Sequence, residues 1–137
     1  MEKIIVQVDW CGKNYAGYIN DARLGGAVFT TGKTFSDLQS DTVKALQFHI
    51  ESCLADGDKL PENIAEGKYT LEYEKRISAI LHEAQKYTTL AALARVTGMK
   101  NAQLSHYANA VTQPKHAQKV RIANGLKIIG QQCMSLA

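Results

Sequence analysis

The sequence contains no apolar run close to the roughly 20 residues that a membrane-spanning helix needs. Its first residues, Met1 to Lys3 and the short alternating run from Ile4, also lack the long apolar segment of a signal peptide. The chain has 137 residues, of which 45% are hydrophobic, and this is enough to build a core. We therefore expect a cytoplasmic protein that does not enter a membrane.

Cysteine is scarce and poorly placed for binding a metal or forming disulfides. Cys11, Cys53 and Cys133 are odd in number and far apart, with no Cys-x-x-Cys pair and no histidine at the spacing of zinc ligands. We expect reduced thiols, with Cys53 on the apolar face of a helix in a structural role. The sequence predicts no metal site and no cofactor.

Signatures of catalysis are also missing. The four histidines have no serine or cysteine arranged with them as nucleophile and base, and Gly25-Gly26 lacks the Lys-Ser/Thr pattern of a phosphate loop. Carboxylates on a predicted sheet and helix are the candidates for a two-metal nuclease. These are Asp9, Glu51, Asp56 and Asp58, but the helical one lies on a polar face and the last two fall where that helix ends. We therefore predict that the protein is not an enzyme.

Charge is distributed unevenly along the chain. From Arg76 onward there are eight Lys and Arg residues against Glu83 alone, a net charge of +7. Up to Lys75 there are eight basic and twelve acidic residues, a net charge of −4. The basic half has the charge expected of a domain that contacts phosphates, and the acidic half should avoid DNA.

The first half alternates between buried and exposed positions in the manner of strands and then changes to the period of a helix. From the expected N-cap Thr34 to about Asp56, apolar residues recur every three or four positions. This stripe is Phe35, Leu38, Thr42, Leu46, Ile50 and Cys53, widened by Val43, Ala45 and Leu54. The predicted strands are 4–10, 15–19, 27–31 and 69–73, with a polar loop at 57–68. The order β-β-β-α-β predicts a small layer in which one helix covers a sheet.

Residues 74–137 are predicted to form an entirely helical second domain, so that the fold class is α+β and the domains are 1–73 and 74–137. A helix beginning near Glu74 and ending around Tyr87 carries an apolar face. After Pro114, a last helical stripe runs to about Gln132. Its apolar positions are Val120, Ala123, Leu126 and Ile129.

Residues 89–114 have the spacing of a helix-turn-helix, the module whose second helix enters the DNA major groove. Ala94 is small enough to let two helices cross closely, and Gly98 suits the bend, where a residue past a helix end commonly needs a positive φ. Thr89 and Asn101 are the expected N-caps of the two helices. The residues expected to share the core beneath the motif are Leu93, Val96, Met99, Leu104 and Tyr107.

The outward face of the second helix is polar. Asn and Gln side chains can pair bidentately with adenine, Ser and His offer shorter contacts to base edges, and lysines neutralise phosphates. A plain helical hairpin with a solvated face would explain any one of these features, but the spacing and the local charge together favour DNA binding. The predicted DNA-binding residues are Thr89, Lys100, Asn101, Ala102, Gln103, Ser105, His106 and Lys115.

These runs carry a resemblance to a known family. The N-terminal runs Tyr15-Ala16-Gly17-Tyr18, Gly32-Lys33-Thr34-Phe35 and Ala45-Leu46-Gln47-Phe48-His49-Ile50-Glu51 resemble the HicB antitoxin family. The C-terminal runs Ala92-Leu93-Ala94-Arg95-Val96-Thr97-Gly98 and Gln103-Leu104-Ser105-His106-Tyr107-Ala108 are similar to the Xre/Cro-like helix-turn-helix of its longer members. The resemblance covers nearly the whole chain.

The resemblance implies a type II toxin–antitoxin system. In that family a partial RNase H-like N-terminal domain, not itself a nuclease, blocks HicA, a small mRNA-cleaving toxin, while the C-terminal domain represses the shared operon by binding double-stranded operator DNA. An acidic first half complements the basic face of a toxin that binds RNA. Related sequences usually have a glycine and then basic residues after the recognition helix, where this chain has Ala110, Thr112 and Gln113 before Lys115. Fewer phosphate contacts predict weaker operator binding.

We therefore predict an antitoxin and autoregulatory repressor that forms a homodimer or homotetramer, because one helix-turn-helix reads only a half-site. The expected contact between copies is part of the last apolar stripe or a sheet edge. The alternative is an ordinary repressor whose first domain senses a small molecule, and an RNase H-like enzyme is the least favoured interpretation.

Overall fold

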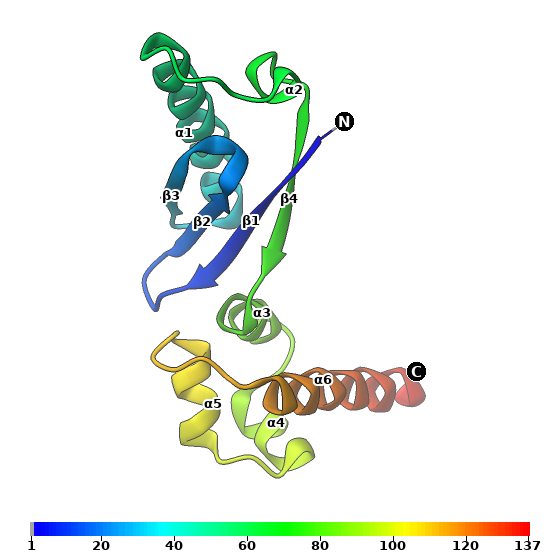
Figure 1. The fold of residues 1–137 in the computed structure, drawn as a ribbon. Coiled ribbons are helices and arrows are strands. Elements are labelled where there is room, and N and C mark those ends of the chain that lie inside the picture. The colour runs from blue at the N-terminus through cyan, green and yellow to red at the C-terminus, as the bar shows by residue number, and fades with distance from the viewer. Residues whose placement is uncertain (1) are drawn as a thin grey trace. The chain divides into compact units, whose positions relative to one another are not determined.

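The computed structural model describes residues 2–137, and the chain divides into two compact units, one up to Arg76 and one from Ile77 onward. The fold class is mixed α and β, as predicted. In the described part of the first unit, a four-stranded sheet has the order β3-β2-β1-β4 (Figure 1). The β1–β2 and β2–β3 pairs are antiparallel and the β1–β4 pair is parallel. The strands are β1 (Glu2–Trp10), β2 (Tyr15–Asp21), β3 (Gly26–Gly32) and β4 (Tyr69–Lys75).

The central strand β1 alternates as its sequence predicts. Ile4, Val6 and Val8 are fully buried, and the residues between them point to the other face of the sheet. Leu71 of β4 is the register partner of Ile4 and Tyr73 that of Val6, so the inner face of β1 continues directly onto β4. The inner faces of these strands form one wall of the core.

Helix α1 (Phe35–Ala55) supplies the other wall. The hydroxyl of Thr34 accepts a hydrogen bond from the backbone N–H of Asp37 at 3.0 Å, which confirms the predicted N-cap. Leu38, Thr42, Leu46 and Ile50 are buried, in agreement with the predicted stripe. The predicted widening of that stripe by Val43 and Leu54 is wrong, because each is 44% exposed and no element of the described unit covers that flank of the helix.

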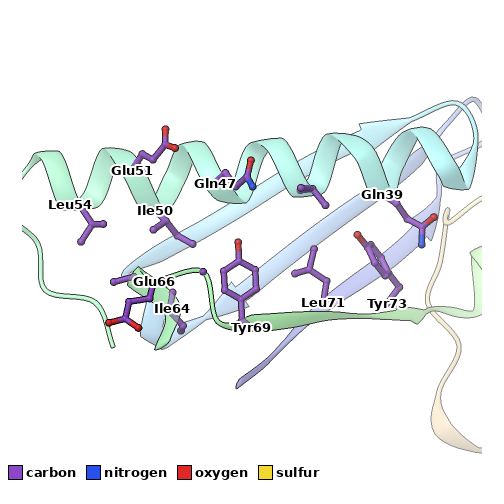
Figure 2. Close-up of a pocket in the computed structure, with 13 residues that line it drawn as sticks. Gln39, Gln47, Ile50, Glu51, Leu54, Ile64, Glu66, Tyr69, Leu71 and Tyr73 are labelled. Atoms are coloured by element: carbon purple, nitrogen blue, oxygen red, sulfur yellow. The ribbon is translucent and has the colours of Figure 1, made fainter. Parts of the chain in front are cut away.

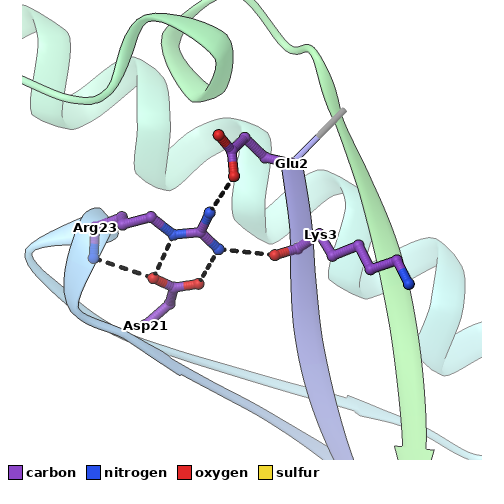
Figure 3. A network of polar contacts seen from close by, with 4 residues as sticks. All are labelled: Glu2, Lys3, Asp21 and Arg23. Atoms are coloured by element: carbon purple, nitrogen blue, oxygen red, sulfur yellow. Dashed lines mark hydrogen bonds and ion pairs between the residues drawn. The ribbon is translucent and has the colours of Figure 1, made fainter.

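Two short elements of the first unit were not predicted. A 3₁₀ turn, η1 (Ala22–Leu24), follows β2, and helix α2 (Glu62–Ala65) interrupts the expected polar loop and buries Ile64. Arg23 ties η1 to β1, because its guanidinium donates to Glu2, to the carbonyl of Lys3 and to Asp21 (Figure 3). These hydrogen bonds from Arg23 lower the pKa of Asp21.

The second unit, all of which the structure describes, contains four helices: α3 (Ile77–Ala84), α4 (Leu90–Thr97), α5 (Asn101–Ala108) and α6 (His116–Leu136). Strand β4 continues to Lys75, so α3 begins at Ile77 and not near Glu74. Helix α3 packs on α5, and α6 packs on α4 (Figure 1). The shared core is Ile77, Leu81, Leu93, Met99, Leu104, Tyr107, Ala108 and Ile122.

Helix α6 packs through a face that includes only half of the predicted stripe. Ile122 and Gly125 are buried, with Leu126 and Ile129 half-buried beside them, whereas Val120 and Ala123 are exposed. A Cβ atom at Gly125 would lie 2.5 Å from Cγ2 of Thr97, so glycine is what lets α6 approach α4 this closely. The helix continues to Leu136, and all residues from Gly130 onward are exposed.

The cysteines lie apart, and in the described residues none forms a disulfide. Cys11 and Cys133 are exposed, while Cys53 is half-buried with its sulfur 3.6 Å from Nε2 of His49. Of the helices in residues 2–137, none combines the length and the hydropathy that crossing a bilayer requires.

Gly32 sets how closely α1 approaches the end of β3, and its replacement tests this constraint. An added Cβ would lie 2.3 Å from the backbone nitrogen of Leu38, an atom that cannot move without displacing the helix. We expect Gly32→Ala to lower the free energy of unfolding of the first unit by about 1–3 kcal/mol. The matched control is Gly26→Ala, whose Cβ would meet only Cε1 of His49 at 3.5 Å. Urea unfolding followed by the fluorescence of Trp10 measures both, and equal midpoints would contradict the prediction.

Candidate functional site

The predicted site lies on α4, α5 and the turn between them. The hydroxyl of Thr89 accepts a hydrogen bond from the N–H of Ala92 at 3.0 Å, which confirms it as the N-cap of α4. Gly98 has φ +73° and donates its N–H to the carbonyl of Ala94 at 2.9 Å. Glycine therefore ends α4 in the left-handed conformation that the sequence predicts.

Thr97 and Arg121 hold the turn in place. The Thr97 hydroxyl donates to the carbonyl of Leu93 at 2.7 Å and accepts from the N–H of Met99 at 3.2 Å. Nη2 of Arg121 donates to the carbonyl of Thr97 at 2.7 Å, so a cation from α6 satisfies the last turn of α4. The direction in which α5 leaves the turn is thus fixed from both sides.

The core beneath the turn contains four of the five residues predicted for it. Leu93, Met99, Leu104 and Tyr107 are buried. Val96 is 38% exposed, and its assignment to the core is a correction. Helix α4 is only eight residues long, and its neighbours α5 and α6 cover the face that carries Leu93.

Helix α5 presents Ala102 and His106 to solvent, one turn apart on the face opposite its buried residues. Asn101 is also exposed, but it is the first residue of the helix and not its N-cap. Lys100 occupies the cap position without a side-chain cap bond, which corrects the sequence prediction. The reason is that α5 begins one residue earlier than the capping pattern implied.

Gln103 and Ser105 lie on the flanks of α5 and are half-buried. Nε2 of Gln103 donates to the hydroxyl of Tyr107 at 2.9 Å, so part of its amide is already engaged within the helix. Asn109, which sequence reasoning missed, is exposed one turn after Ser105 and donates to the carbonyl of that residue at 3.0 Å. In the sequence, its position four residues after Ser105 was the signal that could have identified it.

Exposed cations lie on α4 and α6 and at the caps of α5 and α6. Lys100 precedes the first residue of α5, and Lys115 precedes that of α6, where unpaired N–H groups already favour anions. From Ile77 onward there are seven Lys and Arg residues against Glu83, a net charge of +6. The structure thus gathers Lys100, Asn101, Ala102, Ser105 and His106 on α5, whereas Thr89 begins α4 and Lys115 begins α6.

The segment after α5 contains a strained residue. In residues 2–137, Ala110 is the single non-glycine residue with positive φ, at +59°. Its N–H donates to the carbonyl of Tyr107, and that of Val111 donates to the carbonyl of His106, which closes the helix end. A glycine would adopt this conformation without steric cost, and alanine does not.

A second surface feature, the α1–β4 groove, lies in the first unit (Figure 2). It has a volume of about 770 Å³ and runs between α1 and the inner face of β4, with α2 at one end. Tyr69, Leu71 and Tyr73 rise from β4 toward the helix, and each is half-buried. Burial raises the pKa of both phenols, and a hydrogen bond with Thr42 opposes that rise at Tyr73. Both hydroxyls therefore stay protonated at neutral pH.

The candidate nuclease carboxylates do not gather around a common point. Asp9 lies 3.6 Å from Nη1 of Arg76, Glu51 is exposed on α1, and Asp56 and Asp58 belong to the end of that helix and the following turn. In residues 2–137 no group of three or more His, Cys, Asp or Glu side chains is placed to hold a metal ion.

Comparison with protein-family models, with curated proteins and with solved structures gives no match to this chain.

Relief of the strain at Ala110 is directly testable. We expect Ala110→Gly to raise the stability of the second unit by about 1 kcal/mol, because glycine takes the left-handed conformation freely. The matched control, Ala123→Gly, lies on the exposed face of α6 in ordinary helical geometry and should lower stability by a similar amount. Hydrogen exchange of the core amides of α4 and α5 measures both changes. A loss of protection in Ala110→Gly would refute the assignment of strain.

Proposed function

We propose that this protein is an antitoxin of the HicB type that also represses its own operon. The observation that carries the proposal is the α4–α5 pair, in which a capped helix, a left-handed glycine and a fixed turn present the polar face of α5 beside exposed cations. This arrangement fits a helix-turn-helix, with α5 as the helix that enters the major groove. In this proposal the chain has no catalytic activity of its own.

The first unit has the opposite electrostatic character and takes the other role. Up to Arg76 it carries nine basic and twelve acidic residues, a net charge of −3. Such a unit is repelled by DNA and is attracted to a basic protein, such as a HicA-type toxin with an RNA-binding face. The sheet covered by one helix corresponds to the partial RNase H-like domain of that family.

DNA recognition by α5 is tested with the double variant Asn101→Ala, His106→Ala. Loss of a good base contact typically costs about 1–3 kcal/mol, so we expect at least a tenfold loss of operator affinity in an electrophoretic or fluorescence assay. Rescue of growth from the toxin should be unchanged. The matched control is Asn124→Ala, Gln131→Ala, two exposed amides on α6.

The lysines serve as a second arm of the same experiment. Lys100→Ala and Lys115→Ala should weaken binding to all DNA sequences alike and should each flatten the salt dependence, whereas Lys127→Ala on α6 should do neither. Unchanged specific binding in the α5 double variant would show that recognition lies elsewhere.

The proposed repressor also needs a contact between copies, and α6 supplies one. The face that packs on α4 through Ile122, Leu126 and Ile129 continues at the same helical spacing to Cys133 and Leu136. Both are exposed, Leu136 at 88%, because this end of α6 extends beyond the other helices of the second unit. Two turns of helix with an uncovered apolar face are marginal alone, and a second copy would bury that face.

Sedimentation tests this dimer contact. We expect the chain to be a dimer at micromolar concentration, and Cys133→Lys, Leu136→Lys to dissociate it because the substitution places four like charges in the interface. Gln131→Lys, Ser135→Lys alters exposed residues of the same segment on its other side and should leave the dimer intact. A monomeric wild-type chain would rule out this contact.

A second candidate function is a repressor that senses a small molecule in its first unit. The volume of the α1–β4 groove, about 770 Å³, falls within the range of known ligand sites and supports this alternative. The two functions differ in their partner: the first requires a toxin encoded nearby and rescue of growth from it, and the second requires that a metabolite change operator affinity.

A further inference from the structure

The single helix layer of the first unit is too narrow for its sheet. Neighbouring strands lie about 4.8 Å apart, whereas packed helices lie about 8–10 Å apart, so that one helix covers about two strands. Helix α1 contacts β2 and β3. Ile4 and Val6 of β1 are still fully buried, but their register partners Leu71 and Tyr73 on β4 are only half-buried. The strip of sheet with the least cover is therefore the inner face of β4, where the rings of Phe35 and Tyr73 pack with their centroids 5.5 Å apart.

The flank of α1 that faces this strip is apolar as well. Val43 and Leu54, each 44% exposed, line the α1–β4 groove together with Ile50, and Gln39 and Gln47 add amides to the same flank (Figure 2). Positions 43, 47, 50 and 54 follow each other at helical spacing, so they form one continuous edge. The groove thus has half-exposed apolar side chains on both sides along its length.

Negative charge is concentrated in the elements that build the helical side of this groove. Residues 35–66, which comprise α1, the following loop and α2, contain seven acidic residues and two lysines, a net charge of −5. The rest of the described first unit, residues 2–34 and 67–76, contains five acidic and seven basic residues, a net charge of +2. Of these acidic residues Glu51 and Glu66 line the groove, which contains no basic side chain, whereas Asp41 accepts a hydrogen bond from the N–H of Thr31 on the β3 side of the helix.

We propose that the α1–β4 groove binds a basic amphipathic helix of the protein that this unit neutralises. This inference rests on the proposed function and names the surface and the chemistry of its partner. The helix lies beside α1, its apolar ridge packs on Leu71 and the two tyrosines of β4, and its cations face the groove-lining carboxylates Glu51 and Glu66. Seven residues of β4 span about 23 Å, which matches a helix of about 15 residues.

The shape of the groove favours a helix over a small molecule. A drug-sized ligand site encloses most of its ligand and directs a few polar groups at it. Here the groove follows the whole of β4, and its apolar walls at Val43, Leu54 and Tyr69 remain partly exposed along that length. A helix laid in an apolar groove is an established mode of peptide recognition and needs this open form.

The test measures the affinity of the full-length chain for the purified HicA-type protein encoded beside it. In Val43→Lys, Leu54→Lys we expect an affinity loss of about 30-fold or more, because two charges would lie in an apolar contact. The matched control, Phe29→Lys, Phe48→Lys, changes two residues of the same unit that are 73% and 71% exposed and do not line the groove, and it should bind normally. Operator binding and circular dichroism show that each variant is folded.

A charge-reversal pair tests the second half of the proposal. Glu51→Lys on the wall of the groove should weaken binding, most strongly at low salt, whereas Glu74→Lys on the other face of β4 should have little effect. If the lysine variants fail to fold, hydroxyl-radical labelling of the wild-type complex replaces them. We expect protection of Tyr69 and Tyr73 and none of Tyr18 or Phe29.

The outcomes separate the groove from the proposed function. If the wild-type chain does not bind the toxin, the proposed function and the groove assignment both fail. If it binds and the groove variants bind equally well, or labelling leaves both tyrosines unprotected, the groove assignment alone is overturned. A groove variant that dissociates a dimer without changing toxin affinity would assign the groove to a second copy of the chain, and it would also overturn the proposal.

Discussion

The position of one helix over four strands determines how much of the first unit is left for a partner. Only two residues separate the end of β3 from the start of α1, and Gly32 allows the first turn of the helix to sit against that strand. The buried hydrogen bond between the hydroxyls of Thr30 and Thr42, 2.9 Å long, joins the same two elements. Because the helix is held over the β3 side of the sheet, its ring contact with β4 is at Tyr73, where Phe35 packs at a centroid distance of 5.5 Å, and the inner face of the strand is only half-buried. The partly uncovered inner face of β4 is therefore a consequence of the place where the chain turns from β3 into α1.

In the second unit the constraint is the turn between α4 and α5. Gly98 sets its backbone, Thr97 closes it, and Arg121 joins it to α6, so that α5 is fixed by groups outside itself. This matters because α5 has eight residues and no side-chain cap, and a helix of that length is not stable alone. The strain at Ala110 lies at its other end. A recognition helix in this chain would therefore be oriented at its start by the turn and held at its end by the buried Tyr107 and Ala108, with the strained Ala110 closing it.

The hydrophobic periodicity of the sequence predicted the helices and strands well, but it predicted the burial of individual residues less well. The alternation in β1, the stripe Leu38–Thr42–Leu46–Ile50 and the caps at Thr34 and Thr89 follow from local physics and are confirmed. Val43, Leu54, Val96 and Val120 were misplaced because a pattern identifies apolar residues but not the neighbour that would cover them. Helix α2, with four residues, is about one helical turn long, so its apolar pattern cannot repeat within it. The predicted DNA-binding residues, among them Gln103 with its hydrogen bond to Tyr107, remain predictions.

The net charge of this chain is informative only when it is counted separately for each unit or surface. At physiological ionic strength an electrostatic field decays over about 8 Å, whereas a helix of 21 residues such as α1 or α6 is about 31 Å long. A partner that binds one unit therefore responds to the charge of the surface it contacts and hardly to the net +3 of the whole. For the same reason, −5 along residues 35–66 and +6 in the second unit can coexist without cancelling. In the function proposed above, this separation would let one chain of moderate charge attract a polyanion through one unit and a basic protein through the other.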